Sequence, residues 1–141
     1  MATFNKFNSF VEHLAEKVFD LETDDLTIVL SNTLPDVANS VYADLTEIAD
    51  GNGYTSGGVP ATIVSSGQTD GTYKLVLDDL TITAAGGSVG PFRYFVLVDT
   101  TPTSPASPLI GWWDYGSSIT LADGESITVD FSATDGVLQI S

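Results

Sequence analysis

Residues 61–84 read ATIVSSGQTDGTYKLVLDDLTITA, and this stretch decides the fold class. Three runs rich in β-favouring side chains, Ala61–Ser65, Thr72–Leu77 and Leu80–Ala84, follow one another at short intervals. The pair Asp70-Gly71 separates the first two runs, and Asp-Gly favours the tight type I′ turn of a β-hairpin. The stretch therefore predicts consecutive antiparallel strands.

The same succession of strand-like runs and turns continues to the end of the chain. Asp123-Gly124 and Asp135-Gly136 each lie between two such runs. Strands that recur about every 8–12 residues are typical of an antiparallel β-sandwich or jelly roll rather than of βαβ units. We therefore expect a mostly β, single-domain protein over residues 1–141, with the sandwich over about 26–141. The further strands that we predict are Leu26–Leu30, Phe92–Val98, Leu109–Asp114, Ser118–Leu121, Ser126–Phe131 and Val137–Ile140.

One helix is predicted ahead of the sandwich, over about residues 7–21. Ser9 followed by Glu12 fits a capping box at its start. Six apolar residues share the helical spacing of one stripe, which would pack on the sandwich of the same chain or on a neighbouring subunit. These residues are Phe7, Phe10, Val11, Leu14, Val18 and Leu21.

Two stretches are predicted to be loops. Residues 31–59 are rich in Asn, Asp, Gly and Ser, and we expect an ordered loop with one short strand or helical turn around Tyr42 to Ile48. Residues 99–108 contain three prolines and few apolar side chains, which predicts a stiff surface excursion. This second loop is either a plain connector or a partner-contacting loop.

The charge balance restricts the partners. Nineteen acidic residues face four basic ones, a formal net charge of −15. Such a surface repels phosphate backbones and anionic membranes, so we expect neither nucleic acid nor a membrane as a partner. The chain has no cysteine, no secretory signal and no apolar run long enough to span a membrane, so synthesis in the cytoplasm is expected.

The sequence gives no positive support for catalysis. His13 is the single histidine, and no Gly-x-Ser-x-Gly elbow or phosphate-binding loop is present. The segment from Asp50 begins like a calcium loop, but Ala61 stands at its twelfth position, where that loop needs glutamate. An irregular calcium site built from loop carboxylates stays open as an alternative. We otherwise expect no enzyme, and no catalytic, cofactor-binding or metal-binding residue.

The pair Trp112-Trp113 is the strongest pointer to an interface. Adjacent strand residues point to opposite faces of a sheet. Asp114 prefers water and shares a face with Ile110 and Trp112, so we predict Trp113 in the core and Trp112 as a contact residue. The candidate interface residues are Phe7, Phe10, Leu14, Tyr54, Trp112 and Tyr115.

Five stretches, residues 2–16, 66–75, 90–94, 111–121 and 123–131, together resemble a family of small tailed-bacteriophage virion proteins. The resemblance covers nearly the whole chain and points to a head decoration (cement) protein. It implies a sandwich or jelly-roll subunit that is made in the host cytoplasm and binds the major capsid protein on the capsid exterior. It also implies a homodimer or homotrimer without catalytic residues.

Two other functions remain open. The chain could be a tail or baseplate structural component. It could also be a virion-displayed carbohydrate- or receptor-binding module that uses exposed aromatic side chains such as Tyr54, Trp112 or Tyr115.

Overall fold

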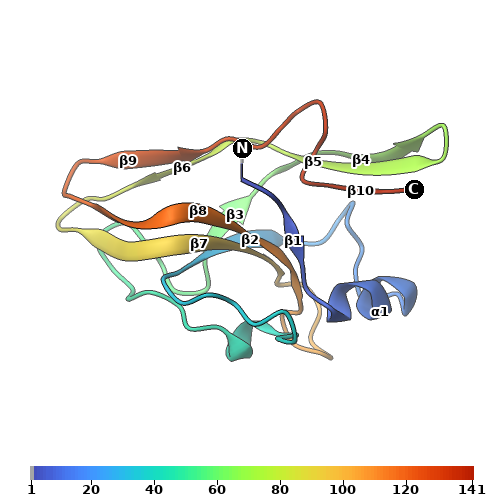
Figure 1. The fold of residues 1–141 in the computed structure, drawn as a ribbon, viewed down its shortest axis with the longest axis horizontal. Coiled ribbons are helices and arrows are strands. Elements are labelled where there is room, and N and C mark those ends of the chain that lie inside the picture. Colours follow the sequence, from blue (N-terminus) through green and yellow to red (C-terminus); the bar gives the residue numbers. More distant parts are fainter. Residues whose placement is uncertain (1) are drawn as a thin grey trace.

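The computed structural model describes residues 2–141 and confirms a mostly β fold built from antiparallel sheets with one α-helix (Figure 1). No helix among these residues is long and apolar enough to cross a membrane. The elements in chain order are β1 (Asn5–Lys6), α1 (Ser9–Ala15), β2 (Leu26–Ser31), the 3-10 helix η1 (Tyr42–Asp44), β3 (Val59–Ala61), β4 (Ile63–Thr69), β5 (Thr72–Leu77), β6 (Leu80–Thr83), β7 (Val89–Asp99), β8 (Leu109–Leu121), β9 (Ser126–Val129) and β10 (Leu138–Ile140).

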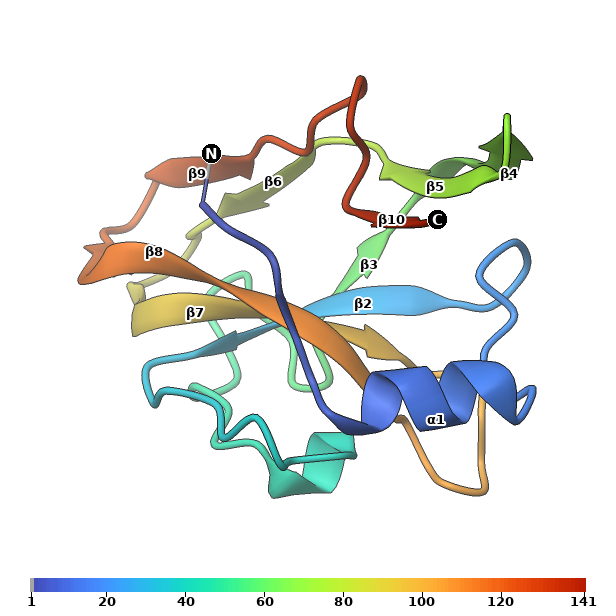
Figure 2. The ribbon, with the colours of Figure 1, turned by 45° about the vertical axis from the view of Figure 1, so that its right-hand side comes forward.

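The strands form two layers (Figure 2). One layer is a five-stranded sheet in the order β1-β8-β7-β2-β3. The other layer consists of two smaller sheets, β10-β5-β4 and β6-β9, which lie end to end over the first. On the side where β8 and β9 lie, the N-terminal segment runs from α1 past β8 towards β9 (Figure 2).

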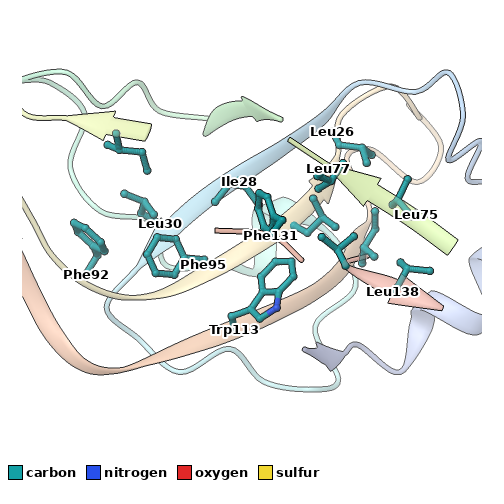
Figure 3. Close-up of a cluster of buried hydrophobic side chains, with 14 of the residues drawn as sticks. Leu26, Ile28, Leu30, Leu75, Leu77, Phe92, Phe95, Trp113, Phe131 and Leu138 are labelled. Carbon is teal, nitrogen blue, oxygen red and sulfur yellow. The ribbon is translucent and has the colours of Figure 1, made fainter. Parts of the chain in front are cut away.

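The main core lies between the two layers (Figure 3). Alternate residues of the central strands β2 and β7 point into it from the large sheet, and β5 and β6 supply residues from the smaller sheets. This arrangement follows from the period-two alternation of strands, which places every second side chain on the same face. Its labelled members include Leu26, Ile28, Leu30, Leu75, Leu77, Phe92, Phe95, Trp113, Phe131 and Leu138.

A second apolar cluster covers the opposite face of the five-stranded sheet. It contains Phe7, Val29, Tyr94, Val96, Val98, Leu109 and Trp112. The long segment between β2 and β3 closes it, with Tyr42 and Leu45 packed against the cluster. The central part of the large sheet is therefore covered on both faces, and the expected helical turn near Tyr42 is confirmed as η1.

The predicted helix over residues 7–21 is wrong in length, because α1 covers only Ser9–Ala15. The chain reverses at Lys17, whose φ of 67° is left-handed, and Val18 N donates to His13 O. Helices commonly end with such a left-handed residue. Phe19 and Leu21 still reach the main core, but from an irregular segment rather than from a helical stripe.

β8 is one strand where the sequence predicts two, and it is irregular. Leu97 pairs with Gly111 and Val98 with Leu109, which leaves Ile110 as an extra residue in the ladder. Such a bulge shifts the alternation of faces. Ile110 consequently points into the main core and Trp112 into the second cluster, so the prediction that these two residues share a face is wrong.

The hairpin turn predicted at Asp70-Gly71 is confirmed, with φ values of 51° and 84° between the paired strands β4 and β5. The other two Asp-Gly pairs are not hairpin turns between paired neighbours. β9 follows Asp123-Gly124 but pairs with β6, and β10 follows Asp135-Gly136 but pairs with β5. Tertiary packing of the smaller sheets over the core thus determines these pairings.

Candidate interaction surfaces

Four of the six candidate interface residues are buried within the chain itself. Phe7 is 0% exposed, Tyr54 1%, Phe10 4% and Trp112 9%. Phe10 and Tyr54 belong to the main core, and Phe7 and Trp112 to the second cluster. Phe7 and Phe10 therefore pack on the sandwich of their own chain, the first of the two alternatives that the sequence leaves open. The prediction of Trp112 as a surface contact residue is wrong, because the N-terminal segment and the long loop cover its face of the sheet. Tyr54 is likewise buried rather than exposed.

The remaining two candidates differ from each other. Leu14 is half-buried against the main core. Tyr115 is 51% exposed. It lies on β8 beyond Trp112, the last residue of β8 that pairs with β1. Tyr115 alone of the six presents an aromatic ring to solvent, with its centroid 6.4 Å from that of Phe95.

The N-terminal arm, residues 2–7, holds both tryptophans. The Phe7 ring lies 4.7 Å from the Trp112 ring on one face, and the Phe4 ring lies 5.3 Å from the Trp113 ring on the other. The arm passes so close to Gly111 that a Cβ there would meet the Phe4 ring at 2.3 Å. Aromatic pairs at such separations contribute about 0.5–1.5 kcal/mol beyond their buried area.

Tyr54 anchors the long loop to the edge of β2. Its hydroxyl accepts from Leu30 N at 3.0 Å and donates to Glu47 Oε2 at 2.6 Å. Gly57 N also donates to Glu47 Oε2, and the Tyr42 hydroxyl donates to Glu47 Oε1. Burial, followed by the Glu47 contact, raises the pKa of Tyr42 to about 12 and raises that of Tyr54 as well.

We expect Tyr54→Phe to lower the free energy of unfolding by about 1–3 kcal/mol, because Leu30 N–H would lose its buried acceptor. Urea denaturation measures the change. Tyr115→Phe is the matched control, since it removes an exposed residue's hydroxyl and should change stability by less than about 0.5 kcal/mol. Equal stabilities of the two variants would show that the Tyr54 hydroxyl does not hold the loop.

A surface patch that the sequence pattern does not indicate lies on this loop. The loop patch consists of the exposed Leu34 and Val37, which line a shallow hollow together with the buried Pro35, the exposed Asp36 and Trp112. Leu34 is 63% exposed and Val37 is 43% exposed. Leu34 and Val37 stand in a polar loop and belong to no regular pattern of apolar residues. The sequence therefore does not indicate that they lie together beside Trp112, which only the fold shows.

The backbone around the loop patch is well anchored. Ser31 Oγ donates to Thr46 O at 2.6 Å and accepts from Thr33 N. Asn8 N donates to Val37 O at 3.0 Å, which ties the loop to the N-terminal segment. The patch is therefore presented on a fixed backbone, which limits the entropy lost when a partner covers it.

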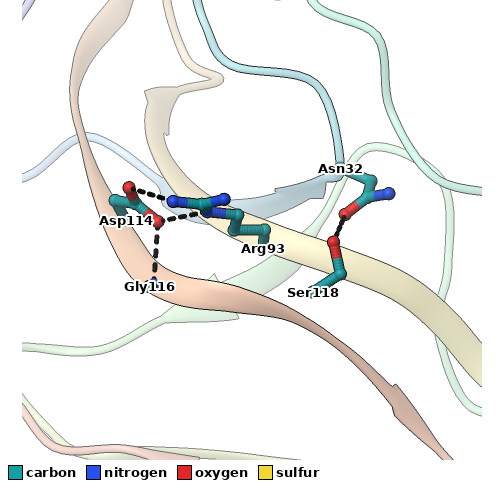
Figure 4. A network of polar contacts seen from close by, with 5 residues as sticks. All are labelled: Asn32, Arg93, Asp114, Gly116 and Ser118. Carbon is teal, nitrogen blue, oxygen red and sulfur yellow. Dashed lines mark hydrogen bonds and ion pairs between the residues drawn. The ribbon is translucent and has the colours of Figure 1, made fainter.

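A polar network lies on the exposed end of the same sheet (Figure 4). Arg93 donates to both carboxylate oxygens of Asp114 at 2.8 and 3.1 Å, and Gly116 N donates to Asp114 Oδ1. The hydrogen bond from Arg93 lowers the pKa of Asp114, and Asp114 raises that of Arg93. Ser118 donates to Asn32 close by. The single arginine of the chain is thus engaged and does not form an anion site.

An apolar pocket of about 190 Å³ opens on the side of the molecule where β8 faces β9. The buried rings of Phe95, Trp113 and Phe131 line it together with the partly buried Ile127 and Val129. Its exposed lining residues are Ala2, Tyr115, Thr128 and Asp130. We call it the edge pocket.

One carboxyl group is buried at the end of β7. Asp99 is 0% exposed, and its Oδ1 accepts from Thr101 N while its Oδ2 has no hydrogen-bond partner. Burial, and then the nearby Asp24 and Asp25, raise the pKa of Asp99 to about 8. Among residues 2–141, no three acidic or histidine side chains converge to hold a metal ion.

The comparisons with known proteins add no relative to these observations. No protein-family model matches the chain, and neither the curated proteins nor the solved structures gave a match.

Proposed function

We propose that this chain is a decoration protein that binds the major capsid protein on the exterior of a bacteriophage head, as a homodimer or homotrimer. It would be made in the host cytoplasm and act in the virion. The resemblance of its sequence to small phage virion proteins supplies the class. The loop patch is the structural observation that carries the proposal.

The loop patch has the properties of a protein-binding site. Leu34 and Val37 would each lose apolar surface to a partner, and the adjacent Trp112 extends the apolar area beneath them. Complete burial of such a side chain contributes about 1.5–3 kcal/mol. An apolar centre within a polar rim is the usual anatomy of such an interface.

The charge of the chain suits the same role. A net charge of −15 keeps free subunits apart and soluble before assembly. It also favours encounter with a basic region of the capsid surface, because complementary charge mainly raises association rates. A protein on the outside of a head does not need to contact the DNA within.

We expect Leu34→Asp combined with Val37→Asp to weaken attachment to heads assembled without this protein by at least about tenfold. Co-sedimentation of the purified variants with such heads measures attachment. Val64→Asp is the matched control, because Val64 on β4 is 61% exposed and lies on the other layer. Both proteins should keep the wild-type melting temperature, since all three side chains are exposed.

Cryo-electron microscopy of the virion then separates the alternatives. Density for this chain on the head exterior supports the proposal, and density in the tail or baseplate refutes it. Wild-type attachment by the Leu34→Asp, Val37→Asp protein would exclude the loop patch as the docking surface.

A further inference from the structure

The outer edge of β9 is a second candidate interface, on the opposite side of the five-stranded sheet from the loop patch. β9 pairs only with β6, through Thr83↔Ser126 to Leu80↔Val129. Its other edge has no paired strand, and residues of β9 line the edge pocket together with residues of β8. Within residues 2–141, no strand covers this edge.

The hydrogen-bonding groups of this edge alternate in a defined way. Ala84 N donates to Glu125 O at 2.8 Å, just beyond the end of the ladder. Residue pairs along an antiparallel ladder alternate between hydrogen-bonded and non-hydrogen-bonded. The backbone groups of Ile127 and Val129 therefore bond to β6. Those of Ser126 and Thr128 point away from β6, with their N–H and C=O groups free. The side chains of Ile127 and Val129 line the edge pocket, and those of Ser126 and Thr128 are exposed.

Three other free edges, those of β3, β4 and β8, lack this combination. β3 contains Pro60, which has no N–H to donate. β4 is exposed along most of its length and borders polar side chains. β8 bulges at residues 115–118, between its paired residues Asp114 and Ile119, and its Gly116 N–H is already bonded to Asp114. Bulges of this kind protect sheet edges from further pairing.

The occupant is constrained by size, hydrogen bonding and charge. A pocket of about 190 Å³ is smaller than the roughly 300–1,000 Å³ of small-molecule sites, and it suits a single bulky side chain. A row of free N–H and C=O groups is satisfied best by an extended polypeptide. The exposed Asp130 is the only charged residue that lines the edge pocket. The chain as a whole has nineteen acidic and four basic residues. Both charges favour a bound segment that carries a lysine or arginine.

We propose that β9 accepts an extended segment of a partner protein as an added strand. The segment places a bulky apolar side chain in the edge pocket, between Trp113 and Phe131, and a lysine or arginine beside Asp130. It closes the side of the molecule between β9 and β8. This inference does not depend on the loop patch or on attachment to a capsid.

The test is selection of a displayed library of random dodecapeptides against the purified chain. We expect enriched peptides to carry an aromatic or large aliphatic residue close to a lysine or arginine. Their binding should weaken at least about tenfold with Thr128→Pro, which removes an outward N–H, and with Asp130→Lys. Gln68→Pro on the β4 edge is the matched control and should leave binding unchanged.

Each alternative result is decisive. Enriched peptides that bind Thr128→Pro and Asp130→Lys like wild type would overturn the proposal, as would a selection without enrichment. A different result would be that no peptide binds, that the wild-type chain dimerises and that Thr128→Pro makes it monomeric. The strand added to β9 would then come from a second copy of this chain, and the proposed partner protein would be refuted. If Thr128→Pro does not fold, the binding of the enriched peptides to Asp130→Lys still tests the proposal, because Asp130 is exposed. The Leu34→Asp, Val37→Asp protein should bind the peptides normally, which separates this site from the proposed capsid attachment.

Discussion

Trp113→Ala is expected to lower the free energy of unfolding by about 3–5 kcal/mol, because it leaves a cavity between the two layers. The Trp113 ring lies 5.3 Å from Phe4 and 5.6 Å from Phe131, so it joins the N-terminal arm to the segment after β9. Urea denaturation with analysis of both midpoint and slope measures the loss.

Trp112→Ala should cost nearly as much, although the sequence pattern assigns Trp112 to an interface. The ring is only 9% exposed and packs 4.7 Å from the buried ring of Phe7 in the second cluster. Its removal would free the N-terminal arm and the long loop from the underside of the sheet. Tyr115→Ala, on the same strand but 51% exposed, is the control and should cost less than about 1 kcal/mol. A Trp112→Ala protein as stable as Tyr115→Ala would support the prediction from the sequence that Trp112 is a surface contact residue.

Most strands of this fold were predictable because they follow a local pattern, but β1 and β3 were not predicted. Period-two alternation and turn residues mark β4, β5, β6 and β9 within a few residues of their observed ends. The pairing of these strands was less predictable, since β9 pairs with β6 across a gap of more than forty residues. Local turn chemistry determined only the β4–β5 hairpin.

The location of the candidate surfaces could not be derived from periodicity. The segment between β2 and β3 has no repeat of apolar residues, so the sequence does not show that it covers one face of the large sheet. That cover buries Trp112 and leaves Leu34 and Val37 exposed instead. Tyr54, from the same segment, reaches the main core. The bulge at Ile110 had a similar effect, because one extra residue exchanged the faces of the residues on either side.

Asp99→Asn is expected to stabilise the protein at neutral pH by up to about 4 kcal/mol. Asp99 in the folded chain has a pKa of about 8, raised by burial and by Asp24 and Asp25 from an ordinary value of 3.8. The folded state therefore holds a proton at pH 7 that the unfolded chain has released. Asparagine reproduces the neutral side chain without this proton uptake, keeps an oxygen for Thr101 N–H and offers an N–H towards Asp24.

The pH dependence has a definite sign. Below about pH 4, Asp99 is protonated in both states, so wild type and variant should have similar stability. Between about pH 4 and pH 8, the unfolded wild type is increasingly favoured, and the advantage of the variant should grow by about 1.4 kcal/mol per pH unit. Above about pH 8 the folded carboxyl also ionises, and the difference should become constant.

Asp130→Asn separates this effect from the general benefit of removing one negative charge from a highly acidic chain. Both substitutions change the net charge equally, but Asp130 is exposed, so its replacement should alter stability by less than about 0.5 kcal/mol. Urea denaturation of the two variants and wild type from pH 4 to pH 9 makes the comparison. A stability difference between Asp99→Asn and wild type that stays constant over this range would mean that Asp99 is already ionised in the folded protein.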